Sequence, residues 1–315
     1  MMIRTGFVGG SDVAAVIGVS PWKTPYALFE EKIGAAVEDS THEDRKKVLR
    51  RGKRLEPVVM EMLQEEHDLN IGERNAIHID PEYEWMRAEI DFEYFFDEGL
   101  GRDLLEVGNG DVKTVSSYAR SGWGEEGSDE VPSYYAAQFL WGQMITGRSI
   151  TMVAALFDAT DLRIYYVPRN EELIAFLRTA AINFWTNHVL TGVAPPIRTA
   201  EDAARVVAKF DGLTVQADDT TRKALDRLKG IKAAEKRLEA KREEYEFAVK
   251  KAFATQAGDE TPGKFALVDE AGMPLASWNL QSCKRVDVTM AKRDFPEFAA
   301  ACTRESTFRV LRCCK

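Results

Sequence analysis

Three charged residues in two short apolar segments have the types and the spacing of a phosphoryl-transfer site. Asp91 ends the run Ala88-Glu-Ile-Asp91, and Asp111-Val-Lys113 follows twenty residues later. If both runs are strands, Asp111 and Lys113 project from the same face. Two carboxylates can bind Mg²⁺, and an adjacent ammonium can hold the attacking water or stabilise charge on phosphoryl oxygens. A cross-strand salt bridge on a solvated sheet face has the same spacing, so the pattern alone leaves both interpretations open.

Two polar residues outside these runs are further candidates for the same site. Glu56 lies beside the apolar stripe of a predicted helix, where a carboxylate needs a cation or hydrogen-bond donors. It could equally be an ordinary residue at the edge of that helix. Gln138 stands among aromatic residues, so it is either a satisfied core amide or a donor that faces a ligand.

Residues near position 10 are suited to binding an anion. Arg4 and Ser11 flank Gly9-Gly10, where the backbone can approach an anion closely. A helix with Ser11 as its N-cap would present free amides to a phosphate, and Arg4 would add a bidentate donor. The alternative is an ordinary N-cap after a flexible start.

The elements that must position these residues alternate between helices and strands. Apolar periodicity and capping residues predict helices over 11–17, 25–33, 44–67, 132–146 and 170–190. Short apolar runs broken by Gly, Asp and Asn predict antiparallel strands between 71 and 115, and a strand pair over 149–157 and 162–167. This part of the chain is therefore expected to mix helices and strands in one domain.

The composition changes after Pro195-Pro196. Residues 199–209 predict a short capped helix, and residues 218–254 are rich in Lys, Glu, Arg and Ala with a narrow apolar stripe. The second pattern favours one long amphipathic helix that packs on its own domain or on a sister subunit, over an arm that contacts DNA. A β-hairpin that turns at Glu270-Ala-Gly272 and a small helical piece near Pro296 are expected to follow.

The 315 residues are 45% hydrophobic and carry a formal net charge of −9. This composition excludes global disorder and a basic protein that coats nucleic acid by bulk charge, but not an enzyme with a locally basic cleft. No apolar stretch approaches the roughly 20 residues of a membrane helix, and the first residues lack a signal-peptide pattern. Neither disulfide nor zinc spacing connects the cysteines, so a reducing cytoplasm is the expected location. The cysteines are Cys283, Cys302, Cys313 and Cys314.

Several segments, taken together, resemble the YqaJ-type viral recombinases, the group that includes phage lambda exonuclease, within the PD-(D/E)XK nuclease fold. Gly52-Lys-Arg-Leu-Glu56-Pro57 has the family's G-x-x-x-E-P pattern, and Pro132-Ser-Tyr-Tyr135-Ala-Ala-Gln138 has its P-x-x-Y-x-x-Q pattern. Asp91 and Asp111-Val-Lys113 match the catalytic strands. The opening motif at 9–25 and the closing helix at 184–196 extend the resemblance to about residues 3–197.

The resemblance implies an α+β fold with α/β/α layers. Its core would be restriction-endonuclease-like, a central mixed sheet flanked by helices, with a C-terminal helical arm and a small β-hairpin as appendages. We therefore expect an exonuclease domain over 1–197, a linker with a short helix over 198–217, and a C-terminal extension over 218–315.

The implied activity is that of a 5′-to-3′ exonuclease on linear double-stranded DNA. Such an enzyme digests one strand with Mg²⁺ or Mn²⁺, leaves a 3′ single-stranded overhang, and works in phage-type recombination beside a single-strand annealing protein. A phage or prophage gene product in a bacterial host cell is the matching setting. Lambda-type members form ring trimers, so a homo-oligomer is expected and a ring trimer is one form of it.

The resemblance also assigns roles to the candidate residues. Asp91 and Asp111 would be metal ligands, with the Val112 carbonyl as a third ligand and Glu56 as an outer or second-metal carboxylate. Lys113 would position or activate water.

The remaining roles concern bracing of the site and contact with DNA. Gln138 and Tyr135 would brace the site, and Arg4 and Ser11 would bind the 5′-terminal phosphate. A basic run just before Glu56 is expected to contact DNA phosphates. Its members with that assignment are Arg50, Arg51, Lys53 and Arg54. Tyr135 is also expected to contact DNA.

Two departures from the family pattern bear on these roles. Asp111 stands where the family usually has Glu, which shortens the side chain by one methylene. Phe92 stands where Gly often follows the first Asp, so its ring must face the core or the DNA. Glu106 could compete for the metal role, but no lysine follows two residues later, so Asp111 is preferred.

Two other classes of function remain as alternatives. One is a catalytically inactive scaffold that binds DNA ends with a nuclease fold. The other is an iron–sulfur, helicase-linked nuclease, which would need a cysteine before the nuclease core, and this sequence has none there.

Overall fold

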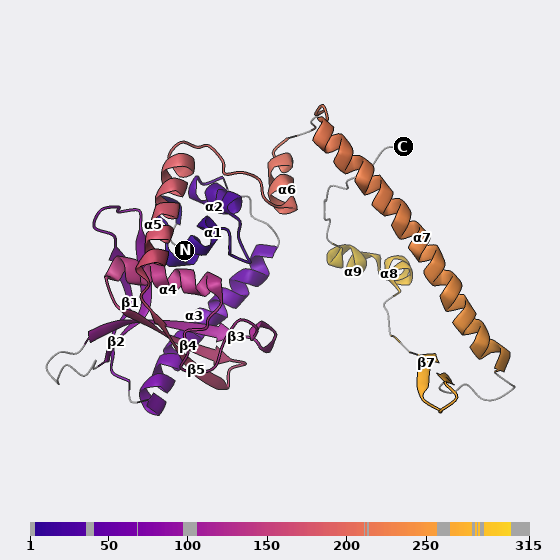
Figure 1. Ribbon diagram of the computed structural model, residues 1–315, viewed down its shortest axis with the longest axis horizontal. Helices are drawn as coiled ribbons and strands as arrows, with labels where there is room; N and C mark the ends of the chain where they lie inside the picture. Colours follow the sequence, from indigo (N-terminus) through magenta and orange to yellow (C-terminus); the bar gives the residue numbers. More distant parts are fainter. Residues whose placement is uncertain are drawn as a thin grey trace. The chain divides into compact units, whose positions relative to one another are not determined.

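The computed structural model describes residues 4–35, 41–67, 69–96, 106–210, 212, 214–256, 265–278, 281, 283 and 287–303. The chain divides into two compact units, Met1–Asp211 and Gly212–Lys315 (Figure 1). Each unit is described by itself below.

A five-stranded mixed sheet forms the centre of the first unit. Its strands lie in chain order, and only β3 and β4 run parallel. A parallel pair needs a crossover, and α4 (Ser133–Thr146) lies in the connection between these two strands. The strands are β1 (Ile71–Ile79), β2 (Arg87–Phe96), β3 (Glu106–Val115), β4 (Ile150–Phe157) and β5 (Asp161–Pro168).

Helices cover both faces of the sheet (Figure 1). The helices α1 (Gly10–Val16), α4 and α5 (Glu171–Phe184) share one apolar cluster with the first half of β2. On the other face, α3 (Thr41–His67) packs Val59, Met60 and Leu63 against β2, β3, β4 and β5. The predicted α+β class, a central mixed sheet flanked by helices, is therefore confirmed.

The predicted N-cap of the first helix is wrong. The N-cap of α1 is Gly9, and Ser11 is an exposed residue inside the helix. Asp12 takes over the capping role, because its Oδ2 accepts the backbone N–H of Gly9 at 3.1 Å. Asp12 is also buried and pairs with the buried Lys32 of α2 (Pro25–Lys32), with 2.8 Å between Nζ and Oδ2. Residue preferences favour Ser at an N-cap. They do not show that Lys32, twenty residues away, pairs with Asp12.

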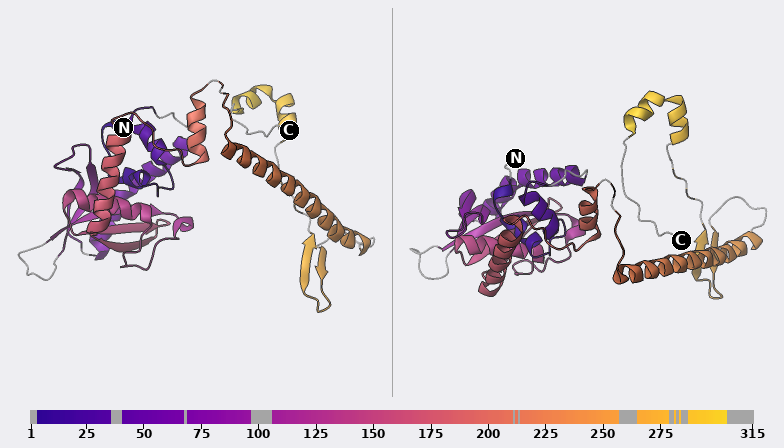
Figure 2. Two further views of the ribbon diagram at one scale, coloured as in Figure 1. Left: turned by 45° about the horizontal axis from the view of Figure 1, so that its top comes forward. Right: turned by 90° about the horizontal axis from the view of Figure 1, so that it is seen from above.

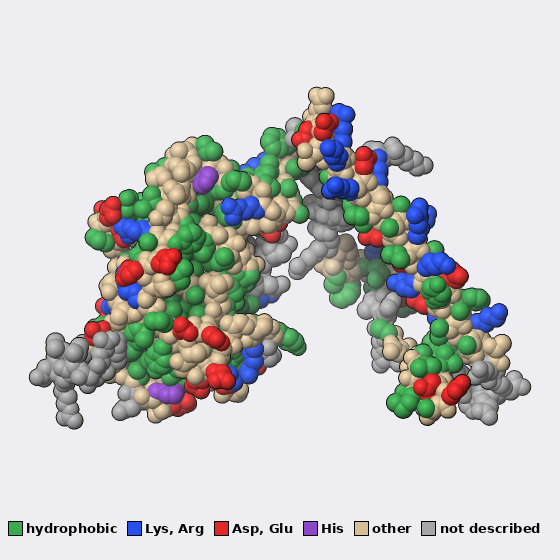
Figure 3. All heavy atoms as spheres, in the orientation of Figure 1, with side chains coloured by type: hydrophobic (Ala, Val, Ile, Leu, Met, Phe, Trp, Pro, Cys, Tyr) green, Lys and Arg blue, Asp and Glu red, His purple; other side chains and the backbone are tan. Residues whose placement is uncertain are grey.

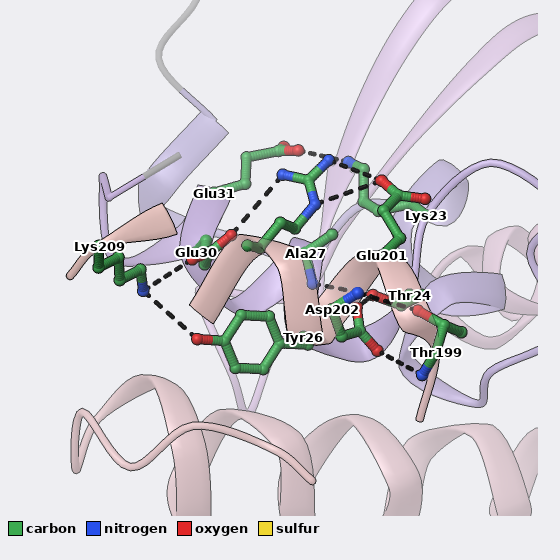
Figure 4. Close-up of polar contacts among 11 residues, drawn as sticks. Lys23, Thr24, Tyr26, Ala27, Glu30, Glu31, Thr199, Glu201, Asp202 and Lys209 are labelled. Carbon is green, nitrogen blue, oxygen red and sulfur yellow. Dashed lines mark hydrogen bonds and ion pairs between the residues drawn. The ribbon is translucent and has the colours of Figure 1, made fainter. Parts of the chain in front are cut away.

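A short helix after the Pro195-Pro196 segment packs back onto α2 in the first unit. This helix, α6 (Ala200–Ala208), begins with a capping box between Thr199 and Asp202. The Asp202 carboxylate is buried and accepts the hydroxyl of Thr24 at 2.5 Å (Figure 4). The buried carboxylate of Glu30 pairs with Lys209 at 2.8 Å, at the other end of the helix.

The second unit holds the predicted C-terminal appendages. It contains α7 (Asp219–Gln256), followed by a hairpin of β6 (Phe265–Val268) and β7 (Pro274–Trp278) and by two short helices, α8 (Val288–Asp294) and α9 (Pro296–Cys302) (Figure 2). The helical arm and the β-hairpin are thus confirmed. None of the described helices is long and apolar enough to cross a membrane. Cys283 and Cys302 are exposed, and the other two cysteines lie outside the described residues.

Two glycines in β3 make room for aromatic rings of β2. A Cβ at Gly110 would lie 2.2 Å from Cε2 of Phe92, and one at Gly108 would lie 2.3 Å from Cε1 of Tyr94. Phe92 is fully buried, so its ring faces the core, one of the two placements expected from the sequence. The rings lie across β3 immediately before Asp111.

We predict that Gly110→Ala destabilises the first unit by about 1–3 kcal/mol, because the packed Phe92 ring must move. The measurement is urea unfolding followed by tryptophan fluorescence. Gly52→Ala is the matched control, since its Cβ would meet only Thr114 Oγ1 at 3.6 Å, and alanine favours the helix. A Gly110→Ala midpoint at or above that of the unaltered protein would contradict the packing argument.

Candidate active site

The predicted catalytic aspartates lie where two paired strands separate. The pairing of β2 with β3 ends at Phe92 opposite Gly110. Beyond that pair, β2 continues only on β1, and β3 continues only on β4. Asp91 and Asp111 are the first residues past the last pair, one on each strand. We call this place the fork; it brings together two carboxylates that are twenty residues apart.

Asp91 replaces the hydrogen bonding that is lost at the fork. Its Oδ2 accepts the backbone N–H of Val112 at 2.9 Å, in place of the ladder bond that β2 would otherwise supply. A buried amide without a partner is costly. The side chain that we expect to bind metal therefore also holds the two strands in their separated geometry.

Asp111 is the most enclosed carboxylate of the fork. It is 7% exposed, its Oδ1 pairs with the ammonium of Lys113, and its Oδ2 accepts the Gln138 amide of α4 at 3.0 Å. The Lys113 ammonium lies 5.1 Å from the centre of the Tyr135 ring and 5.4 Å from that of Phe139, which adds cation–π stabilisation. The Gln138 amide is thus satisfied by Asp111, and a role toward a ligand stays a prediction.

Glu56 approaches the fork from α3. Its side chain is 17% exposed, and its Oε2 lies 3.4 Å from the Lys53 ammonium. Lys53 also lies 3.3 Å from Oε1 of Glu89 and 3.0 Å from Oδ1 of Asn75. The predicted DNA-binding lysine is thus engaged with two carboxylates at the rim of the fork.

Two carboxylates of the fork, Asp111 and Glu56, have raised pKa values. Burial raises the pKa of Asp111 to about 7, with Lys113 opposing the rise and Asp91 and Glu56 adding to it. Burial, and then the charge of Asp91, also raises the pKa of Glu56. Burial opposes the charge of Lys113, yet Asp111 and Asp91 raise its pKa, so Lys113 stays cationic. Carboxylates whose pKa values are raised by burial and by neighbouring acids are common at functional sites.

The donor set of the fork fits a hard divalent cation. Asp91 and Asp111 offer carboxylate oxygens, and Mg²⁺ is commonly bound by one or two carboxylates together with water and substrate phosphates. No group of three or more His, Cys, Asp or Glu residues in the described ranges is arranged to hold an ion by itself. The roles expected of Glu56, as an outer or second-metal carboxylate, and of the Val112 carbonyl, as a third ligand, stay predictions.

A small hollow connects the fork with the start of α1. Gly10, Gly110, Asp111 and Gln138 are among the residues that line it. A Cβ at Gly10 would lie 3.2 Å from Cγ of Gln138, so the glycine segment lies directly against the helix that bears Gln138. Ser11 follows Gly10 on α1. Arg4 lies in the turn Arg4–Gly6, and its side chain is outside what the structure describes.

The basic run occupies the exposed surface of α3. Arg50, Arg51 and Arg54 are exposed there, and the Lys53 side chain is 58% exposed. These residues lie in the two turns that precede Glu56, so a strand bound along them would lead to the fork. The structure thus brings Lys53 to the carboxylates and leaves the three arginines on the surface.

Glu89 is a neighbour of the site that the sequence reasoning missed. It stands two residues before Asp91 and contacts Lys53. The period of two along a strand, applied to Ala88-Glu-Ile-Asp91, would have placed both acids on one face. Glu106, the weaker competitor, lies at the opposite end of β3 and accepts the hydroxyl of Ser149 at 3.2 Å.

Comparison with known families gives a match in the first part of the chain. Residues 1–149 match the model of the YqaJ-like viral recombinase domain. The family resemblance is confirmed for this part of the chain. The matched range contains every residue of the fork, Glu56, Asp91, Asp111, Lys113 and Gln138 included.

The individual proteins that this chain resembles share a quarter or less of their aligned residues with it. The protein YqaJ of Bacillus subtilis (strain 168) is 25% identical over 309 residues, which cover 96% of this chain and 89% of that protein. Crystal structures of LHK-Exo, an alkaline exonuclease from Laribacter hongkongensis, are 18% identical (the complex with dAMP, TM-score 0.45) and 17% identical (TM-score 0.42), and each match covers 65% of this chain and 95% of that chain. A phage related exonuclease from Haemophilus somnus 129PT is 13% identical, with a TM-score of 0.39 over 59% of this chain and 96% of that chain.

We predict that Glu56→Gln raises the stability of the metal-free protein at pH 8 by up to about 1 kcal/mol. A carboxyl whose pKa is raised on folding stabilises the fold below its unfolded pKa of about 4.3, and this contribution is lost as pH rises through the folded pKa. The gain in the variant should therefore vanish near pH 4.

Thermal midpoints measured between pH 4 and pH 8 would test this pH dependence. Glu61→Gln, on the exposed side of the same helix, is the control and should change little at any pH. If the difference in thermal midpoint between Glu56→Gln and the unaltered protein were the same at pH 4 and pH 8, the charge of Glu56 would not destabilise the protein.

Proposed function

We propose that this chain is a Mg²⁺-dependent 5′-to-3′ exonuclease that acts on the ends of linear double-stranded DNA and leaves 3′ single-stranded overhangs. The observation that supports this most is the fork, where Asp91 and Asp111 meet beside the cationic Lys113. The family match over residues 1–149 supports a role in viral-type recombination. The overhang would then be taken over by a single-strand annealing protein.

The reaction proposed is in-line hydrolysis of a phosphodiester. When bound by Asp91 and Asp111, Mg²⁺ or Mn²⁺ would lower the pKa of a water and neutralise charge on the scissile phosphate. Water adds to phosphorus, the bond to the 3′-oxygen breaks, and that oxygen leaves with a proton. The next nucleotide keeps a 5′-phosphate.

Each side chain of the fork has a defined task in this scheme. Lys113 pairs with Asp111, and its ammonium would stabilise charge on the phosphoryl oxygens or position the attacking water. Gln138 donates to Oδ2 of Asp111 and fixes the orientation of that carboxylate. Tyr135 forms the apolar wall beside the Lys113 ammonium, which limits the freedom of that charge.

The 5′-phosphate that each cut creates could be bound near the start of α1. Gly10 lines the hollow that reaches Asp111, and Ser11 follows it. With Arg4, these residues would bind the terminal phosphate one nucleotide away from the fork. This arrangement would favour phosphorylated 5′ ends.

We predict that the purified protein releases mononucleotides from 5′-phosphorylated linear duplex DNA only when Mg²⁺ is present. Each strand should carry its own 5′ label, with and without a terminal phosphate. Lys113→Ala should lower the rate by about 10²–10³, because a donor that stabilises transition-state charge is lost. Lys250→Ala, an exposed lysine of α7, is the control.

The outcomes separate the candidate functions. Release from the opposite end would make the polarity wrong, and equal rates on phosphorylated and hydroxyl ends would exclude the 5′-phosphate site. If the unaltered protein and Lys113→Ala both bound ends and released nothing, the protein would be a scaffold that binds DNA ends.

We also predict that charge reversal of Arg50 and Arg51 weakens DNA-end binding and flattens its salt dependence. Each phosphate contact that is lost should reduce the slope of log K against log salt by about one. Arg50→Lys with Arg51→Lys is the matched control, because it keeps both charges. An unchanged slope in Arg50→Glu with Arg51→Glu would remove this part of α3 from the DNA interface.

A further inference from the structure

The long helix α7 leaves an apolar seam exposed along most of its length. Alanine or a large apolar residue recurs every seven residues, at Ala224, Ile231, Leu238, Tyr245 and Ala252. Ile231, Leu238 and Tyr245 are 56%, 69% and 63% exposed. Side chains of this size in a row on a helix usually pack against a partner. Figure 3 shows apolar side chains between charged ones along this helix.

A second row completes the heptad pattern but is interrupted by charge. Four residues after each of the first four members come Leu228, Glu235, Arg242 and Val249. The two rows together have the a and d spacing of a coiled coil sustained over four heptads. A glutamate and an arginine seven residues apart thus occupy the middle of the seam, where a charged residue specifies the partner and its register.

Two adjoining stretches in the middle of α7 carry opposite net charge. Residues 222–237 contain seven basic and two acidic side chains, whereas residues 238–249 contain four acidic and two basic ones, and Lys250 and Lys251 follow the acidic stretch. The flanking position next to the seam carries Lys232 in the basic stretch and Glu239 and Glu246 in the acidic one. A second copy reversed about Leu238 therefore places its acidic stretch opposite the basic stretch of the first.

Orientation decides whether the seam charges attract or repel. Two parallel copies would place Glu235 against Glu235 and Arg242 against Arg242, which is unfavourable for buried or half-buried charges. In an antiparallel pair centred near Leu238, each Glu235 comes within one helical turn of Arg242 on the other copy. Arg242 pairs with Glu239 and Glu246 of its own helix, but such exposed pairs contribute little, so exchange of partner is not costly.

We propose that α7 pairs with α7 of a second copy of this chain as an antiparallel two-helix coiled coil, held in register by Glu235 and Arg242 across the seam. The occupant is a second copy because the same helix supplies both the apolar stripe and the complementary charge. A polyanion such as DNA would match the basic stretch 222–237 but would leave the apolar seam and the acidic stretch 238–249 without a role.

The test measures self-association of the full chain by sedimentation velocity over a range of concentrations. Glu235→Arg and Arg242→Glu should each weaken association by about tenfold or more, because like charges meet in the seam. The combined variant Glu235→Arg with Arg242→Glu should restore association to within about threefold, because the opposite charges face each other again. Leu238→Asp should abolish association through α7.

Matched controls carry the same charge changes outside the seam. Glu243→Arg and Lys236→Glu lie one position beyond Arg242 and Glu235 and should change association by less than about twofold. Circular dichroism at 222 nm verifies that each variant keeps its helix.

Several outcomes would overturn the proposal. If the protein stays monomeric, α7 does not pair with itself. The same conclusion follows if none of the seam variants changes the strength of association. Single variants that weaken association without rescue in the combined variant would exclude the antiparallel arrangement. DNA binding by a monomer that is lost in Lys229→Glu would assign the helix to a polyanion. Nuclease activity is measured separately, so its failure would leave this result standing.

Discussion

The loss of pairing between β2 and β3 after Phe92 and Gly110 is the constraint on which the candidate site depends. A mixed sheet normally satisfies its backbone groups along the whole length of neighbouring strands. Here the two strands separate, and the side chain of Asp91 binds the amide of Val112 that the ladder no longer satisfies. The separation creates space between the strands, and the same carboxylate that stabilises it becomes available at its edge. The strand separation that shapes this part of the sheet therefore also forms the candidate site.

Charge balance at the fork follows from this geometry. Glu56, Asp91 and Asp111 crowd together, and lysines compensate from two directions, Lys113 from the interior and Lys53 from the rim. Lys113 contacts one oxygen of Asp111, and Gln138 contacts the other. Because each carboxylate oxygen has two lone pairs, a divalent cation would share this carboxylate with the ammonium and the amide.

Much of the fold and part of the candidate site could be predicted from local sequence. The other features depend on contacts between residues that are far apart in the chain. The period of two in Asp111-Val-Lys113 and the glycine breaks around it were sufficient to place both residues on one strand face. The apolar stripe of residues 44–67 was sufficient to predict the helix α3. Ser11 was misassigned as an N-cap because Asp12 is buried by Lys32, a contact that no local pattern encodes. Glu89 could have been found from strand periodicity, whereas the position of Lys53 between Glu56, Glu89 and Asn75 requires three separate elements to converge.

The hydrogen bond between Thr24 and Asp202 joins residues that are 178 positions apart. This hydrogen bond and the ion pair of Glu30 with Lys209 fix α6 to the amino-terminal region of the first unit. Removal of residues 197–209 would leave the buried Glu30 carboxylate without Lys209 and the Thr24 hydroxyl without Asp202. Limited digestion should therefore spare this stretch, although it has the composition of a linker, and the first compact unit continues to Asp211.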